Sequence, residues 1–461
     1  MADAVAVRDM AARLNRTDFH RWAARTRTTG GCLQPVHLRG AVEYRDALTG
    51  TLLHRYTTGR EPGGTLRVAC KTRRVSRCPS CAETYRADTY HLIRAGLTGG
   101  KGVLTTVTEH PAAFVTLTAP SFGAVHARRE RDGKTLACRP RRDGGTCQHG
   151  RPVSCTTRHG AEDARLGQPL CAQCFDYRAA VLWNAHAPEL WRRFTLAVRR
   201  HLARTAGLRA GELREVLTVS FAKVAEYQRR GLVHFHAVIR LDGPDGPAAA
   251  PPAWATHDAL ADAVRHARGA VTVRTPECGD VPALELVWGV QLDIRPIATT
   301  GALTDRAVAG YVAKYATKAA ECVGTLDRRI RATDDVDGLP VTDHARRLIT
   351  TCLRLGAVET FAGLRLAEWA HMLGFRGHFS TKSRAYSTTL GRLRAERCNH
   401  NQRAHEVTTG RLPFDDDAVL VVAHWRYVGQ GLTPGERLLT TALTGTPLPA
   451  LGTSTCARRP A

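Results

Sequence analysis

Two histidines and one glutamate in a short stretch of the chain could bind a metal ion. His234 and His236 flank Phe235 in an apolar, β-branched run that is typical of a strand. Because side chains alternate along a strand, both imidazoles should lie on one face. If the preceding turn is the three residues 229–231, Glu226 pairs with His234, and paired Cβ atoms lie about 4.5–5.5 Å apart. Two imidazoles and a carboxylate at that distance suit one divalent cation, here Mg²⁺ or Mn²⁺.

A stripe of tyrosines and lysines follows in the predicted helix 304–320. Its four members are spaced i, i+3, i+4 and i+7 and so share one helical face: Tyr311, Lys314, Tyr315 and Lys318. A phenol is a weak nucleophile at neutral pH, but nearby ammonium groups favour its phenolate. Lysine also neutralises charge on a phosphate in a transition state. We therefore expect these residues to be catalytic, with a tyrosine attacking a phosphodiester beside the bound metal.

Eight of the 14 cysteines gather in two clusters that are typical of zinc sites. The first cluster contains three cysteines, for which a fourth ligand is expected at Cys32: Cys70, Cys78 and Cys81. The second contains five: Cys138, Cys147, Cys155, Cys171 and Cys174. Its closing C-x-x-C pair is expected to combine with two of the other three cysteines, with His149 and His159 as alternatives. Up to two structural zinc ions per chain follow from this pattern.

The segments that must position these groups predict an α+β fold. The segment 215–241 has two apolar arms around a tight polar connection and predicts a β-hairpin. A buried strand is predicted at 112–118, and helices at 177–206, interrupted at Pro188, and at 304–320. We expect a central antiparallel sheet with flanking helices, in which the tyrosine helix packs near the metal-binding face.

Three consecutive regions are expected along the chain. They are an N-terminal basic region with a cysteine cluster (1–100), a catalytic domain (101–320) and a C-terminal basic accessory region (321–461). Residues 126–176 are polar, rich in Arg, Gly and Cys, and too long for a plain loop in a compact domain. They are predicted to be a zinc-binding insertion in the catalytic domain.

The composition favours a cytoplasmic DNA-binding protein. The chain has 461 residues, of which 43% are hydrophobic, and no apolar run approaches the roughly 18 residues that a membrane span needs. The N-terminal segment lacks the order of a signal peptide, so reduced thiols and no membrane partner are expected. Lys and Arg number 66 against 42 Asp and Glu, which gives a net charge of +24. Codon bias in a GC-rich genome would add Arg but would not by itself lower Asp and Glu, so the excess favours a nucleic-acid partner.

Three motifs in this order resemble those of HUH-type rolling-circle replication initiators. They are FVTLT (114–118), EYQRRGLVHFH (226–236) and YVAKYATK (311–318). The resemblance is strongest to initiators of actinobacterial plasmids and integrative elements, which are related to those of single-stranded DNA phages. It implies an HUH endonuclease core with His234 and His236 as metal ligands. It also implies a nucleophile pair of two tyrosines followed by Lys318. The third ligand is expected to be Glu226, with Gln228 as its rival.

The function expected from these motifs is metal-dependent nicking and joining of origin DNA, single-stranded or in a hairpin. A 5′-phosphotyrosine would form and a free 3′-hydroxyl would be left to prime synthesis. Tyr315 is expected to act first and Tyr311 in the second transfer. A host helicase and the replication machinery are expected partners, since no complete P-loop is present. Arg376–Arg397 and parts of 1–100 are expected to contact the origin. The alternatives are an HUH-type transposase or mobilisation relaxase, and a non-enzymatic zinc-ribbon DNA-binding regulator.

Overall fold

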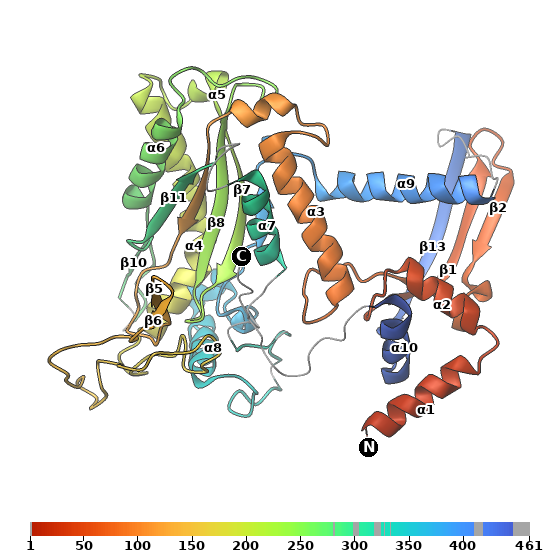
Figure 1. The fold of residues 1–461 in the computed structure, drawn as a ribbon, viewed down its shortest axis with the longest axis horizontal. Coiled ribbons are helices and arrows are strands. Elements are labelled where there is room, and N and C mark those ends of the chain that lie inside the picture. Colours follow the sequence, from red (N-terminus) through yellow and green to blue (C-terminus); the bar gives the residue numbers. More distant parts are fainter. Residues whose placement is uncertain are drawn as a thin grey trace. The chain divides into compact units, whose positions relative to one another are not determined.

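The chain forms two compact units, each described here by itself (Figure 1). Among the described residues, unit 1 contains 2–89 and 389–445, and unit 2 contains 90–388. The computed structural model describes the following residues: 2–279, 282–297, 304–317, 324–326, 328–331, 333–409 and 418–445. None of the helices within these ranges is long and apolar enough to cross a membrane.

Unit 1 joins the two ends of the chain through one antiparallel sheet. The C-terminal strand β13 (Val419–Gln430) pairs with β1 (Val36–Asp46) along its whole length, and β1 also pairs with β2 (Leu52–Thr57) and β3 (Leu66–Val68). The helices of this unit are α1 (Ala2–Leu14), α2 (Phe19–Thr28), α9 (Leu390–Thr409) and α10 (Pro434–Thr444). This division differs from the expected regions 1–100, 101–320 and 321–461, because a strand pairing joins the first region to the last.

Unit 2 is built on a five-stranded antiparallel sheet, so the predicted α+β class with an antiparallel sheet is confirmed. The strand order is β11 (Leu292–Pro296), β4 (Ala112–Leu117), β8 (Val233–Asp242), β7 (Thr218–Tyr227) and β12 (Ser380–Lys382). The central pair β7 and β8 is the predicted hairpin, and β4 is the strand predicted at 112–118. Residues 343–388 also belong to this unit, since β12 pairs with β7 and α8 (Asp343–Gly356) packs into the same core.

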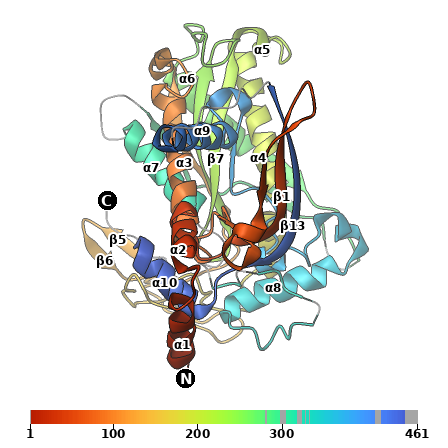
Figure 2. The same ribbon diagram turned by 90° about the vertical axis from the view of Figure 1, so that its right-hand side faces the viewer.

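Helices cover both faces of this sheet (Figures 1 and 2). On one face, α4 (Tyr177–Thr205) and α6 (His257–Ala270) enclose the main core, where Trp191 contacts Phe221 and Phe235. The opposite face carries α7 (Asp305–Ala316) and the end of α3 (Pro79–Thr98). The predicted interruption at Pro188 is wrong: α4 continues through it, because the 15 buried residues of α4 outweigh one lost backbone hydrogen bond.

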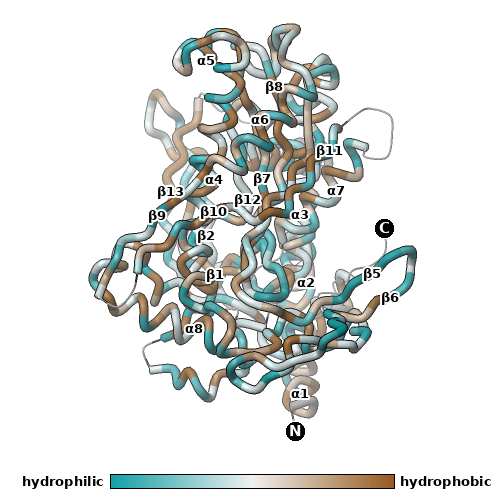
Figure 3. Tube along the Cα trace, turned by 90° about the vertical axis from the view of Figure 1, so that its left-hand side faces the viewer, coloured by the Kyte–Doolittle hydropathy of each residue, from teal (hydrophilic) through white to brown (hydrophobic). Residues whose placement is uncertain are grey.

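The predicted insertion contains little regular structure. Its only strands within the described residues form the short hairpin of β5 (Arg129–Arg131) and β6 (Lys134–Leu136), which is largely hydrophilic in Figure 3. The other small elements of unit 2 are α5 (Leu213–Val216), β9 (Thr272–Arg274) and β10 (Glu285–Val287). Most side chains between residues 126 and 170 are exposed or partly exposed, so hydrophobic burial alone does not order this segment.

A buried ionic network holds α3 against the α7-bearing face of the sheet. Arg240 and Asp242 on β8 are both fully buried, and Arg240 Nε donates to Asp242 Oδ1 over 2.6 Å. Ser220 Oγ donates to Asp242 Oδ2 over 2.6 Å, and His110 Nδ1 lies 2.8 Å from Oδ1. Arg240 also donates to the carbonyl oxygens of Gly96 on α3 and of Tyr386. Every member has a partner, which is the condition under which a buried charge pair is tolerated.

Replacement of Asp242 by alanine should therefore be strongly destabilising. The change leaves the Arg240 guanidinium buried without its carboxylate, so the free energy of unfolding should fall by about 3–5 kcal/mol. Urea unfolding of the full chain measures this loss. The matched control is Glu368→Ala, which breaks the exposed pair with Arg365 and should leave the free energy of unfolding almost unchanged, because solvent screens such a pair. Equal losses in the two variants would show that the network is not a stabilising element.

Candidate active site

A three-residue turn sets the register of the β7–β8 hairpin. Gln228 N donates to Leu232 O over 2.8 Å, and Gly231 N donates to Gln228 O over 2.9 Å. Gly231 has φ +78°, a left-handed conformation that glycine adopts without strain. Glu226 consequently pairs with His234, in the register predicted from the sequence.

This register brings three metal-binding side chains to one point on the sheet. Glu226 Oε2 lies 2.9 Å from His234 Nε2 and 3.2 Å from His236 Nε2, and the two imidazole nitrogens are 2.9 Å apart. Two nitrogens and one oxygen that converge in this way could hold one divalent metal ion and leave positions open on it. The rival ligand, Gln228, accepts a hydrogen bond on its side-chain oxygen from Arg230 Nε over 2.8 Å.

The protonation of this group suits metal binding. Burial raises the pKa of Glu226, but hydrogen bonds from His234 and His236 outweigh it and bring the value to about 2. Burial lowers the pKa of His236 below the ordinary histidine value. At neutral pH the carboxylate is therefore ionised and the His236 imidazole is neutral, which are the forms that bind a metal.

Strand β4 supplies two contacts that orient His236. Thr116 pairs with His236 across the strands, and its Oγ1 lies 3.0 Å from His236 Nδ1. Phe114 stacks on the same imidazole with ring centroids 5.7 Å apart and an interplanar angle of 5°. A hydrogen bond at the second ring nitrogen leaves Nε2 available for a metal. The sequence alone assigns no role to Thr116, although this residue lies in the FVTLT motif. The pairing of β4 with β8 is the signal that identifies it.

Helix α7 places both tyrosines beside His236. The Tyr311 hydroxyl lies 3.4 Å from His236 Nε2, and the Tyr315 ring centroid lies 5.5 Å from that of the imidazole. Tyr311 is 38% exposed, whereas Tyr315 is 5% exposed and packs into the interface with the sheet. The helix begins after Thr304, whose side chain accepts a hydrogen bond from Ala307 N.

The structure describes one of the two lysines of the expected catalytic stripe. Lys314 lies in the last turn of α7 and is partly exposed. Lys318 lies outside the described residues. The pair of phenols is therefore the part of the stripe that the geometry places next to the metal-binding group.

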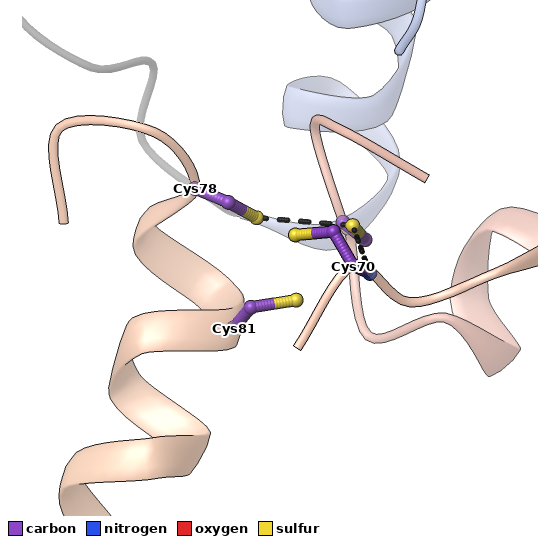
Figure 4. Close-up of side chains that lie close together, drawn as sticks. Cys70, Cys78 and Cys81 are labelled. Atoms are coloured by element: carbon purple, nitrogen blue, oxygen red, sulfur yellow. Dashed lines mark hydrogen bonds between the residues drawn. The ribbon is translucent and has the colours of Figure 1, made fainter. Parts of the chain in front are cut away.

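The four cysteines expected to form the first zinc site converge in unit 1. This N-terminal thiol cluster consists of Cys32, Cys70, Cys78 and Cys81, and all four sulfur atoms lie within 4.8 Å of one another. In Figure 4 the side chains of Cys70, Cys78 and Cys81 turn toward a common point at the start of α3. Hydrogen bonding from the neighbouring thiols, Cys32 above all, lowers the pKa of Cys78. Four thiols in this arrangement fit a tetrahedral zinc ion.

The donors of the insertion form two clusters, whereas the sequence predicted one site. The knuckle cluster combines the C-x-x-C pair with one cysteine and one histidine: Cys147, His149, Cys171 and Cys174. The His126 cluster contains the remaining two cysteines and two histidines: His126, Cys138, Cys155 and His159. The grouping differs from the single expected site because backbone hydrogen bonds between Arg139 and Cys155 bring Cys155 next to Cys138 rather than to the C-x-x-C pair. His126 was missed, since no short spacing connects it to a cysteine.

A family model and a curated protein, both described as replication initiators, match most of the chain. The family described as RepSA, replication initiator protein of pSAM2, matches residues 18–445. A replication initiator protein of Streptomyces ambofaciens is 50% identical over 429 residues, which cover 92% of this chain and 89% of that protein. No solved structure matches the chain.

Removal of the carboxylate should weaken metal binding at this site. In Glu226→Gln the Mn²⁺ dissociation constant should rise at least about tenfold, since even a contact that only supports a metal ligand is worth about 10–100-fold. Titration of the zinc-loaded protein with Mn²⁺, followed by electron paramagnetic resonance, measures this change. Gln228→Ala is the control and should bind Mn²⁺ as the wild type does. A loss of affinity in Gln228→Ala alone would identify Gln228 as the third ligand instead.

Proposed function

This chain belongs to the replication initiator protein family of pSAM2, and we propose that it starts rolling-circle replication by nicking origin DNA with a tyrosine. The proposed enzyme is an HUH-type, metal-dependent endonuclease and strand transferase. Its substrate is a single strand or hairpin at the origin, presented with help from a host helicase and replication machinery.

The observation that carries this proposal is the position of a phenol beside a three-ligand metal group. The Tyr311 hydroxyl lies 3.4 Å from His236 Nε2, so a phosphate bound near the ligands would lie within reach of a nucleophile. A divalent metal held by Glu226, His234 and His236 would polarise the phosphodiester and stabilise charge on its oxygens. A DNA-binding regulator without enzymatic activity would have no use for this combination.

The proposed reaction is an in-line transfer of a phosphoryl group to tyrosine. The phenol gives up its proton to solvent, and its oxygen forms a bond to phosphorus while the bond from phosphorus to the 3′ oxygen breaks. The leaving oxygen takes up a proton and becomes a 3′-hydroxyl, and the 5′ end stays on the protein as a phosphotyrosine. The stored ester can later be attacked by a 3′-hydroxyl, which restores a continuous strand and frees the tyrosine.

The geometry favours Tyr311 as the first nucleophile, which reverses the order expected from the sequence. Tyr311 is the more exposed phenol, and its hydroxyl contacts a metal-ligand nitrogen, whereas Tyr315 is buried beneath it. The two ring centroids are 4.5 Å apart, so a small shift of α7 or of the DNA would bring Tyr315 to the same phosphate. Tyr315 would then serve the second transfer.

Three structural zinc ions complete the proposal, one more than the sequence predicted. Each would occupy one of the four-donor groups: the N-terminal thiol cluster, the knuckle cluster and the His126 cluster. Four protein ligands leave no open position on zinc, so these ions would stabilise the fold rather than take part in cleavage.

Mapping of the covalent adduct tests the order of the tyrosines. With Mn²⁺ and single-stranded origin DNA, the wild type should form a protein–DNA adduct that survives denaturation. Tyr311→Phe should lose at least about 100-fold of the initial adduct, because it lacks the attacking oxygen. Tyr315→Phe should keep the first nick and fail to complete strand transfer.

Peptide mapping of the adduct by mass spectrometry separates the outcomes. An adduct found on Tyr315 in the wild type would restore the order expected from the sequence. The absence of any adduct across the origin, with Mn²⁺ bound, would remove the enzymatic proposal and favour a DNA-binding regulator.

A further inference from the structure

We propose that the His126 cluster binds a zinc ion that positions the turn between β7 and β8, and through it the ligands of the catalytic metal. The inference rests on the proposed function for the role of those ligands. It assigns to His126, Cys138, Cys155 and His159 a task distinct from that of the other two clusters.

The donor atoms of the His126 cluster are spaced as zinc requires. His126 Nδ1 lies 3.2 Å from His159 Nε2, and Cys155 Sγ lies 3.6 Å from the same nitrogen. Ligand atoms about 2.0–2.3 Å from a tetrahedral zinc ion are about 3.3–3.8 Å apart. Cys138 and His159 are each only 1% exposed, so the group lies inside the insertion rather than on its surface.

Contacts around the cluster fix the positions of two donors. His159 Nδ1 lies 2.7 Å from Asp163 Oδ2, and Asp163 is itself held by Arg165, whose Nη2 donates over 2.9 Å. A carboxylate at Nδ1 keeps the proton there and directs Nε2 toward the metal, as in many zinc proteins. Cys138 Sγ accepts a hydrogen bond from Ala127 N over 3.2 Å, which ties this sulfur to the backbone next to His126.

The ligands of this cluster bracket a loop that touches the catalytic hairpin. His126 N donates to Gln168 O over 2.8 Å, and Gly167 N donates to His126 O over 2.9 Å. The segment 160–168 therefore begins directly after one zinc ligand, His159, and ends hydrogen-bonded to another. A bound zinc ion would tie the two ends of this segment together.

That segment holds Arg229, the first residue of the β7–β8 turn, at two points. Arg229 Nη2 donates to Ala161 O over 2.7 Å. Gly167 lies so close to the turn that an added Cβ would be 2.3 Å from Arg229 O. Arg229 is three residues after Glu226 and five before His234, so a displaced turn would displace both ligands. The insertion has too little apolar burial to fix this contact without a metal.

Two variants test the proposal in different ways, and a third is their control. His159→Ala removes a zinc ligand. Gly167→Ala keeps all ligands but forces the loop away from Arg229, at a position with φ +86°. Gly160→Ala lies in the same loop, where an added Cβ meets no atom within 4 Å, and should behave as the wild type. The measurements are zinc content, Mn²⁺ affinity and hydrogen–deuterium exchange of residues 226–236, all on the full chain without DNA.

The wild type and Gly167→Ala should contain three zinc ions per chain, and His159→Ala should contain two. Both variants should bind Mn²⁺ about tenfold more weakly and exchange faster in the turn, as expected for lost support of metal ligands. An unchanged zinc content in His159→Ala would overturn the site. Wild-type exchange in the turn of both variants would overturn its positioning role. Two zinc ions retained in His159→Ala show that the rest of the chain is folded.

Failure of the proposed function would be seen in other measurements than failure of the zinc site. A wild type that binds no Mn²⁺, or forms no adduct with DNA, would contradict the nicking activity, whereas zinc content and exchange would still decide the role of the His126 cluster.

Discussion

The candidate site depends on the register of one hairpin. Because strand side chains alternate between faces, a shift of β8 by one residue would move both imidazoles away from Glu226 and into the core beneath α4. The left-handed glycine at 231 and the backbone bond between Gln228 and Leu232 fix this register locally. Arg230 and His344 reinforce it from neighbouring segments: Arg230 donates to the carbonyl of Ala119 over 2.8 Å, and His344 Nε2 lies 3.0 Å from the Arg230 carbonyl oxygen.

The two faces of the central sheet differ in the side chains that they carry. The face under α4 and α6 is a dry aromatic core, which holds the strands rigid. On the other face, β8 carries the two imidazoles that contact Glu226 and, farther along the strand, the buried Arg240–Asp242 pair. Rigid strands position a site more accurately than loops do, and α7 adds the two tyrosines as a separate layer. A phenol on a helix can move slightly against the sheet without any change in the ligand geometry.

Local signals in the sequence were sufficient to predict the hairpin at the centre of the site. Pairings between distant segments could not be predicted from such signals. The hairpin, the strand at 112–118 and the α+β class followed from alternation, turn chemistry and helical spacing within short windows. The role of Thr116 depends on which strand lies beside β8, and the grouping of the insertion cysteines depends on backbone pairing between residues 139 and 155. Spacing alone does not determine either. The burial of Tyr315 was also missed, because a helical stripe does not reveal which of its members faces the sheet.

The pairing of β1 with β13 has a consequence for the order in which the chain folds during synthesis. About 370 residues separate the end of one strand from the start of the other, and the described residues of unit 2 lie between them. At about 5–20 residues per second, a ribosome needs roughly 20–75 s to make that interval. Throughout this time β1 has no long partner strand, whereas the segment of unit 2 that ends at Thr388 is complete before β13 is made. Unit 2 can thus begin to fold as an independent body before β13 is made, and unit 1 closes only after β13 has been synthesised.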